Sequence, residues 1–331
     1  MAKKAELKIY NDYNYENTWE LEQELSLETL WDLQEGENPQ QKAGVFKSEH
    51  MADYEVFSGK TLTYSEVISL TELANILSEF YDVFAVAIIK DELLCGIALA
   101  PTLEEAYNKA FDCDPLASFY GIIGCSDTIN AELAKHLNSM SVQLIMAPDF
   151  EADAIEILEK NSDIKVVKLN TPLKNIKKLP QKEIRVTPFG TIWQEENSIN
   201  LAAGNFEIVT KTKPTKEQVE DAVFAWKVSK HAHSNSVVIA KDFKTVAISQ
   251  GETSSVTAVE HAMTAACDAS KEAILVSDMV LPTIDAIHTA VQGRIALIVQ
   301  PGGSPNDEKL IEAADKYGIA MAFTGIKNYK R

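Results

Sequence analysis

Short apolar runs alternate with amphipathic stretches along most of this chain, and no other feature limits its possible folds as much. Leu70, Leu73, Ala74 and Leu77 have helical spacing and lead into the apolar run 83–89. Short apolar runs bounded by turn residues are typical of buried strands. The runs predicted as strands are 83–89, 96–100, 119–126, 142–148, 164–170, 234–242, 244–251, 273–278, 295–303 and 320–325. Strands and helices in turn predict a layered α/β architecture.

The alternation is interrupted once, by a basic, proline-containing stretch that begins near residue 171. A chain of 331 residues is long enough for two domains, each with its own core. We therefore predict two α/β domains in tandem, at 31–205 and 206–331. Residues 1–30 are acidic and rich in Asn and Tyr, and they are predicted to be an N-terminal extension. Within and just after it, 20–33 is predicted to form an amphipathic helix.

The charge balance excludes several kinds of partner. The chain has 49 acidic and 31 basic residues, which gives a formal charge of −18. A protein that binds nucleic acid or an anionic membrane surface needs a basic footprint, so neither partner is expected. The apolar runs are far too short to span a membrane, and the N-terminus lacks the apolar segment of a signal peptide. A cytoplasmic location is the prediction.

No cysteine pattern indicates a disulfide framework or a zinc site. The four cysteines are scattered along the chain without a C-x-x-C pair: Cys95, Cys113, Cys125 and Cys267. His231 and His233 have no acidic or thiol partner at ligand spacing. With Lys227 and Lys230, these histidines form a basic helix end, which is either a ligand site or a solvated end that favours the helix dipole. No metal is predicted.

Polar residues follow several predicted strands. Lys90 ends the run 83–89 and is followed by two acids, Asp91 and Glu92. This segment either does chemistry at the end of a buried strand or is a solvated turn between two strands. Asp278 likewise ends the run 273–278, where an N-cap and a polar site residue are both common.

A Pro-Gly-Gly-Ser turn follows the run 295–299, at Pro301, Gly302 and Gly303. Free backbone N–H groups at such a turn suit an anion, but an ordinary strand-to-helix turn also uses glycine. The chain contains neither a P-loop nor a strand-linked G-x-G-x-x-G motif. Nucleotide binding of those two kinds is therefore not predicted.

Taken together, these segments resemble the transformylase portion of the AICAR transformylase/IMP cyclohydrolase family. The resemblance runs in the family's order over about residues 33–326. The matching stretches are 36–46, 85–98, 103–123, 145–158, 224–242, 277–285 and 298–325. It implies tandem cytidine-deaminase-like three-layer α/β/α domains without the deaminase zinc, and a homodimer with active sites at its interface. About thirty residues precede the resemblance, too few for the family's cyclohydrolase domain.

The resemblance also implies a reaction, the transfer of a formyl group from 10-formyltetrahydrofolate to the 5-amino group of AICAR. This amine is a poor nucleophile, so the site needs a base, a proton donor for the leaving nitrogen and groups that hold the oxyanion. The family has a Lys-His pair where this chain has Lys90 and Asp91. Asn235 matches an asparagine that supports the same chemistry.

Several positions depart from the family pattern. An aspartate is ordinarily ionised at pH 7, so Asp91 has no proton to donate where the family has histidine. Neutral Gln34 and Ser255 stand where the family has arginines, and Lys327 stands where arginine is common. A phosphate loses about 1.5–3 kcal/mol for each charged hydrogen bond removed.

Three hypotheses remain open. The first is an AICAR transformylase or a formyltransferase with an altered amine substrate, in which Lys90, Asp91 and Asn235 are catalytic. The second is a catalytically degenerate paralogue that serves as a ligand-binding or regulatory homodimer, and the third is an unrelated α/β binding protein. The residues expected to bind the nucleotide or the folate are Gln34, Asn38, Lys227, Ser234, Asp278, Pro301, Gly302, Gly303 and Lys327.

Overall fold

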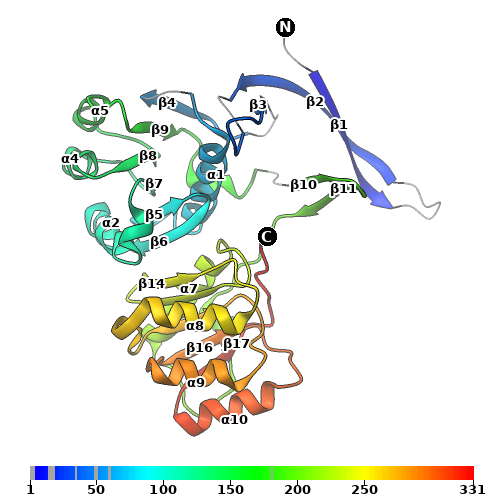
Figure 1. Cartoon of the computed structure of the whole chain (residues 1–331), viewed down its shortest axis with the longest axis vertical. Helices are drawn as coiled ribbons and strands as arrows, with labels where there is room; N and C mark the ends of the chain where they lie inside the picture. The colour runs from blue at the N-terminus through cyan, green and yellow to red at the C-terminus, as the bar shows by residue number, and fades with distance from the viewer. Residues whose placement is uncertain (1–3, 14–18, 34–35, 48–50, 59–60, 180–181) are drawn as a thin grey trace.

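A twelve-stranded sheet runs through both halves of the protein in the computed structural model (Figure 1). The structure describes residues 4–13, 19–33, 36–47, 51–58, 61–179 and 182–331. The first half contributes β4 (Tyr54–Ser58), β5 (Ala85–Lys90), β6 (Leu93–Leu99), β7 (Gly121–Cys125), β8 (Val142–Ala147) and β9 (Lys165–Leu169). The second half contributes β12 (Glu207–Ile208), β13 (Val237–Lys241), β14 (Lys244–Ser249), β15 (Ile274–Ser277), β16 (Leu297–Gln300) and β17 (Ala320–Phe323).

The second half repeats the topology of the first. The strand order is β12-β17-β16-β15-β13-β14 followed by β6-β5-β7-β8-β9-β4, so each half is the reverse of the other. In each half an antiparallel hairpin is followed by three parallel strands and closed by an antiparallel edge strand. Each half, which we call a unit, therefore has an α/β arrangement of its own, whereas the division into two domains with a boundary near residue 205 stays a prediction.

The units join through their hairpins. β14 pairs antiparallel with β6 at Lys244 and Ala98. The buried Thr245 hydroxyl accepts the Ile97 N–H at 3.0 Å and donates to the Ile97 carbonyl at 3.1 Å. One sheet thus continues from one unit into the other.

Helices cover both faces of the sheet and give three layers. The helices are α1 (Tyr64–Ser78), α2 (Leu103–Phe111), α3 (Pro115–Ser118), α4 (Ala131–Ser139), α5 (Ala152–Glu159), α6 (Leu173–Ile176), α7 (Lys216–Ser229), α8 (Ser255–Ala266), α9 (Ile284–Gln292) and α10 (Asp307–Tyr317). Alternate residues of each strand face opposite layers. Ala87 and Ile89 belong to the core under α1 and α7, whereas Val86 and Ile88 belong to the core under α2 and α4.

Two hairpins project from the body on one side (Figure 1). β1 (Lys4–Tyr13) pairs with β2 (Trp19–Asp32), which also pairs with β3 (Gly44–Lys47). β10 (Lys182–Thr187) and β11 (Gly190–Glu195) form the second hairpin.

The helix predicted at 20–33 is wrong, because this segment is the strand β2. Its odd-numbered positions from Trp19 to Trp31 are mostly apolar and its even-numbered positions mostly acidic. That is a period of two, which is the signature of a strand and not of a helix.

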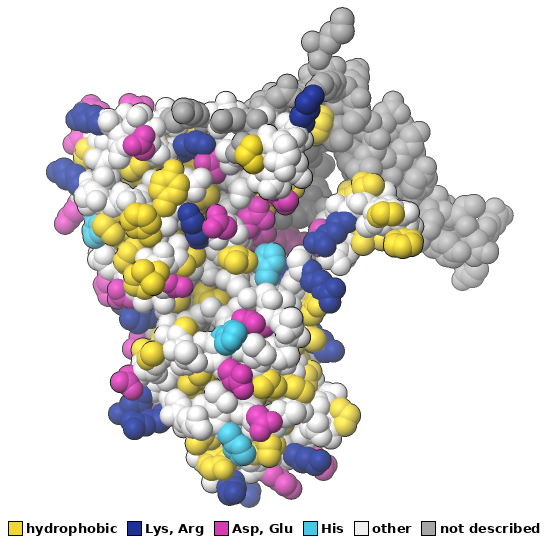
Figure 2. Space-filling model, viewed as in Figure 1, with side chains coloured by type: hydrophobic (Ala, Val, Ile, Leu, Met, Phe, Trp, Pro, Cys, Tyr) yellow, Lys and Arg dark blue, Asp and Glu magenta, His cyan; other side chains and the backbone are white. Residues whose placement is uncertain are grey.

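Charged side chains of both signs are interspersed over the face drawn in Figure 2. Lys and Arg residues there lie next to Asp and Glu residues instead of gathering into one patch. Within the described ranges, no helix has both the length and the apolar character needed to cross a membrane.

Candidate functional site

One edge of the sheet collects most of the predicted site residues. β5 runs antiparallel to β6, β6 to β14, β14 to β13 and β13 to β15. The β5–β6 turn, the end of β14, the start of β13 and the ends of β15 and β16 therefore lie on the same edge, which we call the site edge. Segments as far apart in the sequence as Lys90 and Gln300 meet there.

Lys90 and Asp91 lie at the β5–β6 turn of the site edge. Asp91 and Glu92 have φ values of +48° and +69°, which makes a two-residue hairpin turn. The Lys90 ammonium donates to the Tyr120 carbonyl at 3.1 Å and lies 5.1 Å from the centre of the Tyr120 ring. Asp91 is exposed. Residues 91 and 92 thus form a turn between two strands, and the catalytic role of Lys90 and Asp91 at this turn stays a prediction.

The turn lies in a negative environment. Burial raises the pKa of Glu92, and the carboxylates of Glu37, Glu72 and Asp91 raise it further, against a hydrogen bond from Ser65. Such surroundings do not favour an anionic ligand at this end of the site edge.

Ser234 and Asp278 lie together at the start of β13 and the end of β15. The Ser234 hydroxyl donates to the Asp278 carboxylate and accepts the Lys330 N–H at 3.0 Å. The Ser236 N–H donates to Asp278 Oδ1 at 2.9 Å. Asp278 is only 1% exposed, and burial raises its pKa despite these hydrogen bonds. The Ser234 and Asp278 side chains therefore fix the segment before β13 to the end of β15.

Asn235 is fixed beside them by the loop that follows β14. Its backbone N–H and its Nδ2 both donate to the Glu252 carbonyl, at 3.2 and 2.8 Å, and its carbonyl accepts the Glu252 N–H. Among the described residues, none donates to Asn235 Oδ1. The carboxamide is therefore oriented while its oxygen remains available as an acceptor.

The Pro301–Gly303 turn follows β16 on the same edge. Gly302 and Gly303 have φ values of +72° and +89°, which only glycine adopts without strain. The N–H groups of Gly303 and Ser304 donate to Asp307 Oδ2 at 2.7 and 3.0 Å. Since the chain's own carboxylate occupies these donors, the turn has the form of an ordinary strand-to-helix connection.

Other predicted ligands lie elsewhere. Lys227 donates to the Glu79 carbonyl at 3.1 Å, between the two units. Lys327 is exposed in the segment after β17. Asn38 hydrogen-bonds Gln41 in a surface loop, and Gln34 lies outside the described residues.

Near the start of β8, the Glu66 carboxylate is already paired with other side chains of the first unit. Gln143 donates to Glu66 Oε1 at 3.1 Å. Lys165 binds both oxygens of the same carboxylate, at 2.7 and 2.6 Å. Glu66 is buried, so this ion pair belongs to the interior of the first unit.

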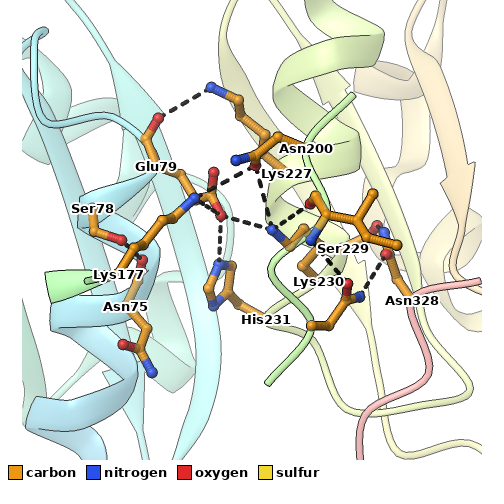
Figure 3. Close-up of polar contacts among 12 residues, drawn as sticks. Asn75, Ser78, Glu79, Lys177, Asn200, Lys227, Ser229, Lys230, His231 and Asn328 are labelled. Carbon is orange, nitrogen blue, oxygen red and sulfur yellow. Dashed lines mark hydrogen bonds and ion pairs between the residues drawn. The ribbon is translucent and has the colours of Figure 1, made fainter. Parts of the chain in front are cut away.

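A buried polar junction between the units was missed by the sequence interpretation. Figure 3 shows Glu79, from the end of α1, facing Lys177, Lys230 and His231. Glu79 Oε1 lies 2.9 Å from Lys230 Nζ, 2.5 Å from Lys177 Nζ and 3.8 Å from His231 Nε2. The solvated helix end considered for Lys230 is wrong, because this residue is 9% exposed. We call these four residues the inter-unit junction.

In the inter-unit junction, the ion pairs lower the pKa of Glu79 by more than burial raises it. Burial alone raises the pKa of Glu79, but the nearby His231 imidazole and the ammonium groups of Lys177 and Lys230 hold that pKa well below its usual range. Lys230 also donates to the Ile199 carbonyl at 2.8 Å. One feature of the sequence points to this junction. Glu72 and Glu79 are seven residues apart, so both lie on the same side of the helix. In the structure, Glu72 pairs with Lys330.

We expect the protein to be less stable at pH 5.5 than at pH 7.5 because of its buried histidines. Burial lowers the pKa of His231 and of His233, so below about pH 6.5 the unfolded chain binds protons that the folded protein does not. The free energy of unfolding then falls as the pH drops. Urea unfolding at both pH values checks this, and His231→Gln should reduce the difference. An unchanged difference in the variant would contradict it.

The described residues contain no group of three or more His, Cys, Asp or Glu side chains placed to hold a metal ion. A cavity of about 320 Å³ lies between the β10–β11 hairpin and the end of the chain, lined in part by Arg185, Trp193, Tyr329 and Arg331. It contains none of the predicted site residues.

Comparison with known proteins shows the family to which this chain belongs. Residues 4–265 match the family described as AICARFT/IMPCHase bienzyme. The chain is 36% identical to the bifunctional purine biosynthesis protein PurH of Thermoanaerobacter sp. (strain X514) over 328 residues, which are 97% of this chain and 63% of that protein. PurH of Dictyostelium discoideum is 36% identical over 309 residues, 90% of this chain and 57% of that protein. PurH of Chlorobaculum parvum is 34% identical over 343 residues, 100% of this chain and 63% of that protein. The chain thus spans about three fifths of these relatives, and it belongs to the AICARFT/IMPCHase bienzyme family.

Proposed function

We propose that this protein transfers a formyl group from 10-formyltetrahydrofolate to AICAR or a related amine, as a transformylase of purine biosynthesis. The observation that carries the proposal is the 36% identity to a PurH protein over 97% of the chain. The tandem repeat of the sheet topology supports two cytidine-deaminase-like domains. No step in this chemistry needs a metal.

The site edge offers the groups that such a transfer needs. Lys90 and Asn235 are three strand spacings apart, about 14 Å, so the Lys90 side chain would have to leave the Tyr120 carbonyl and extend toward Asn235 for both to reach one intermediate. The amine nitrogen would form a bond to the formyl carbon, and the bond from that carbon to the folate nitrogen would then break. Lys90 would polarise the formyl oxygen and Asn235 Oδ1 would accept from the intermediate. The proton leaves the amine and ends on the folate nitrogen, with Asp91 as the base.

The second candidate function is a ligand-binding or regulatory homodimer without turnover. A specific observation favours it: Asp91 lies on an exposed turn beside Glu92, and Ser234 and the Gly303 N–H are already bound by the chain itself. Neutral Gln34 and Ser255 also weaken any phosphate site. A homodimer is part of both candidates, and the exposed Val186, Phe189 and Ile192 of the β10–β11 hairpin support it.

A formyl-transfer assay with AICAR and 10-formyltetrahydrofolate separates the two candidates. For the transformylase we expect turnover in the wild type and a loss of about 10²–10³-fold in kcat with Lys90→Ala, since Lys90 stabilises charge in the transition state. Lys244→Ala, in the other unit's hairpin strand, is the matched control. Binding of AICAR in calorimetry without any turnover would favour the regulatory homodimer.

A further inference from the structure

The segment that carries Ser234 and Asn235 is held at both ends. At its far end, Ser234 and Ser236 bind Asp278, and Asn235 binds the Glu252 carbonyl. All of these partners belong to the second unit. They fix the segment to β15 and to the loop after β14.

The near end of the segment is held by the other unit. Lys230 is the C-cap of α7, and its ammonium lies 2.9 Å from the Glu79 carboxylate at the end of α1 (Figure 3). Both side chains are nearly inaccessible to solvent, so this ion pair is not screened as a surface pair would be. Lys227 adds a second contact one turn earlier, to the Glu79 carbonyl at 3.1 Å.

Only three residues separate these two anchors. The His231 side chain is 11% exposed and its carbonyl accepts from Lys330 Nζ at 3.4 Å, and Ala232 is fully buried. Four residues of chain span at most about 14 Å, so a shift at Lys230 is passed on to Ser234 and Asn235. α1, which carries Glu79, leads directly into β5, which ends at Lys90.

We propose that Glu79 is a positioning residue: its buried carboxylate, through Lys230, sets where the Ser234–Asn235 segment lies relative to the unit that bears Lys90. The positioning is a property of the fold alone, and its effect on turnover rests on the proposed function. Glu79 touches no substrate in this scheme. Its main link to the Ser234–Asn235 segment is the ion pair with Lys230.

Hydrogen exchange of the full-length protein tests the proposal. In Glu79→Gln we expect the amides of Ser234, Asn235 and Ser236 to exchange at least about tenfold faster, although each is bonded to a group other than Glu79. The matched control is Glu66→Gln, which also removes a buried carboxylate from a lysine but lies within the first unit. The control should leave these three amides unchanged.

Two outcomes would overturn the proposal. One is unchanged exchange at the three amides in Glu79→Gln, and the other is the same acceleration throughout the protein, which marks a general loss of stability. If Glu79→Gln does not fold, Lys177→Met removes one of the two lysines on Glu79 and should accelerate the same amides to a smaller extent.

Kinetics then separate this proposal from the proposed function. If the wild type transfers formyl groups, Glu79→Gln should lower kcat while KM for AICAR changes less than twofold to threefold, because the displaced groups act on the intermediate. A wild type without turnover would contradict the proposed function. Hydrogen exchange in Glu79→Gln would still show whether Glu79 positions the Ser234–Asn235 segment.

Discussion

Asp91→His is expected to raise kcat/KM for formyl transfer by about 10²–10⁴-fold, the usual contribution of a positioned proton-transfer group. An imidazole titrates near neutral pH and both accepts and donates a proton there, whereas a carboxylate at pH 7 only accepts. The turn tolerates the change, because Asp91 has φ +48° and histidine is among the residues enriched in that region. The measurement is steady-state formyl transfer at pH 7.

Asp91→Asn is the matched control for that variant. It removes the negative charge and keeps the shape, but it carries no proton. If Asp91→Asn gained as much as Asp91→His, relief of charge repulsion near Glu92 would be the cause, and proton transfer would not. An unchanged kcat/KM in both variants would show that Asp91 takes no part in the reaction.

Lys230→Met is expected to lower the free energy of unfolding by about 3–5 kcal/mol, the cost of removing one partner of a buried ion pair. Among the residues that the structure describes, the change leaves the more exposed Lys177 as the one lysine paired with the nearly inaccessible Glu79 carboxylate. It also leaves the Ile199 carbonyl without the hydrogen bond from Lys230. Urea unfolding at pH 7 measures the loss, with an unchanged m value as the check for two-state behaviour.

Lys216→Met supplies the control on the same helix. Lys216 is largely exposed and pairs only with Glu220 one turn later, so its loss should stay within about 0.5 kcal/mol. The double variant Glu79→Gln with Lys230→Met should lose less than the two single variants together, since no charge is left buried alone. Additive losses, or a loss for Lys230→Met as small as the control's, would contradict the expected role of the pair.

Much of the fold follows from local sequence patterns. Apolar runs correctly predict ten strands of the twelve-stranded sheet and their order, whereas the edge strands β4 and β12 were not predicted. The wrong helix at β2 came from assigning a period of 3.6 to a segment whose period is two. The resemblance to the AICAR transformylase/IMP cyclohydrolase family is confirmed by the family match and the PurH relatives.

The candidate site was predicted less completely than the fold. Lys90, Asn235 and Asp278 each follow or precede a strand, and the structure brings those strand ends to one edge. The donors of the Pro301–Gly303 turn are occupied by Asp307, a contact that depends on the conformation of the turn. Ser234 is occupied by Asp278, which is 44 residues away.

The sequence by itself determined the elements, their order and the family, because these depend on periodicity, turn residues and the run of matching segments. Only the tertiary structure decided that β14 joins β6 in one sheet and that Lys230 is buried against Glu79. The physical reason is distance along the chain: these partners are about 150 residues apart, so no local pattern records their pairing. Charged residues at a helix end look solvated until another unit packs over them.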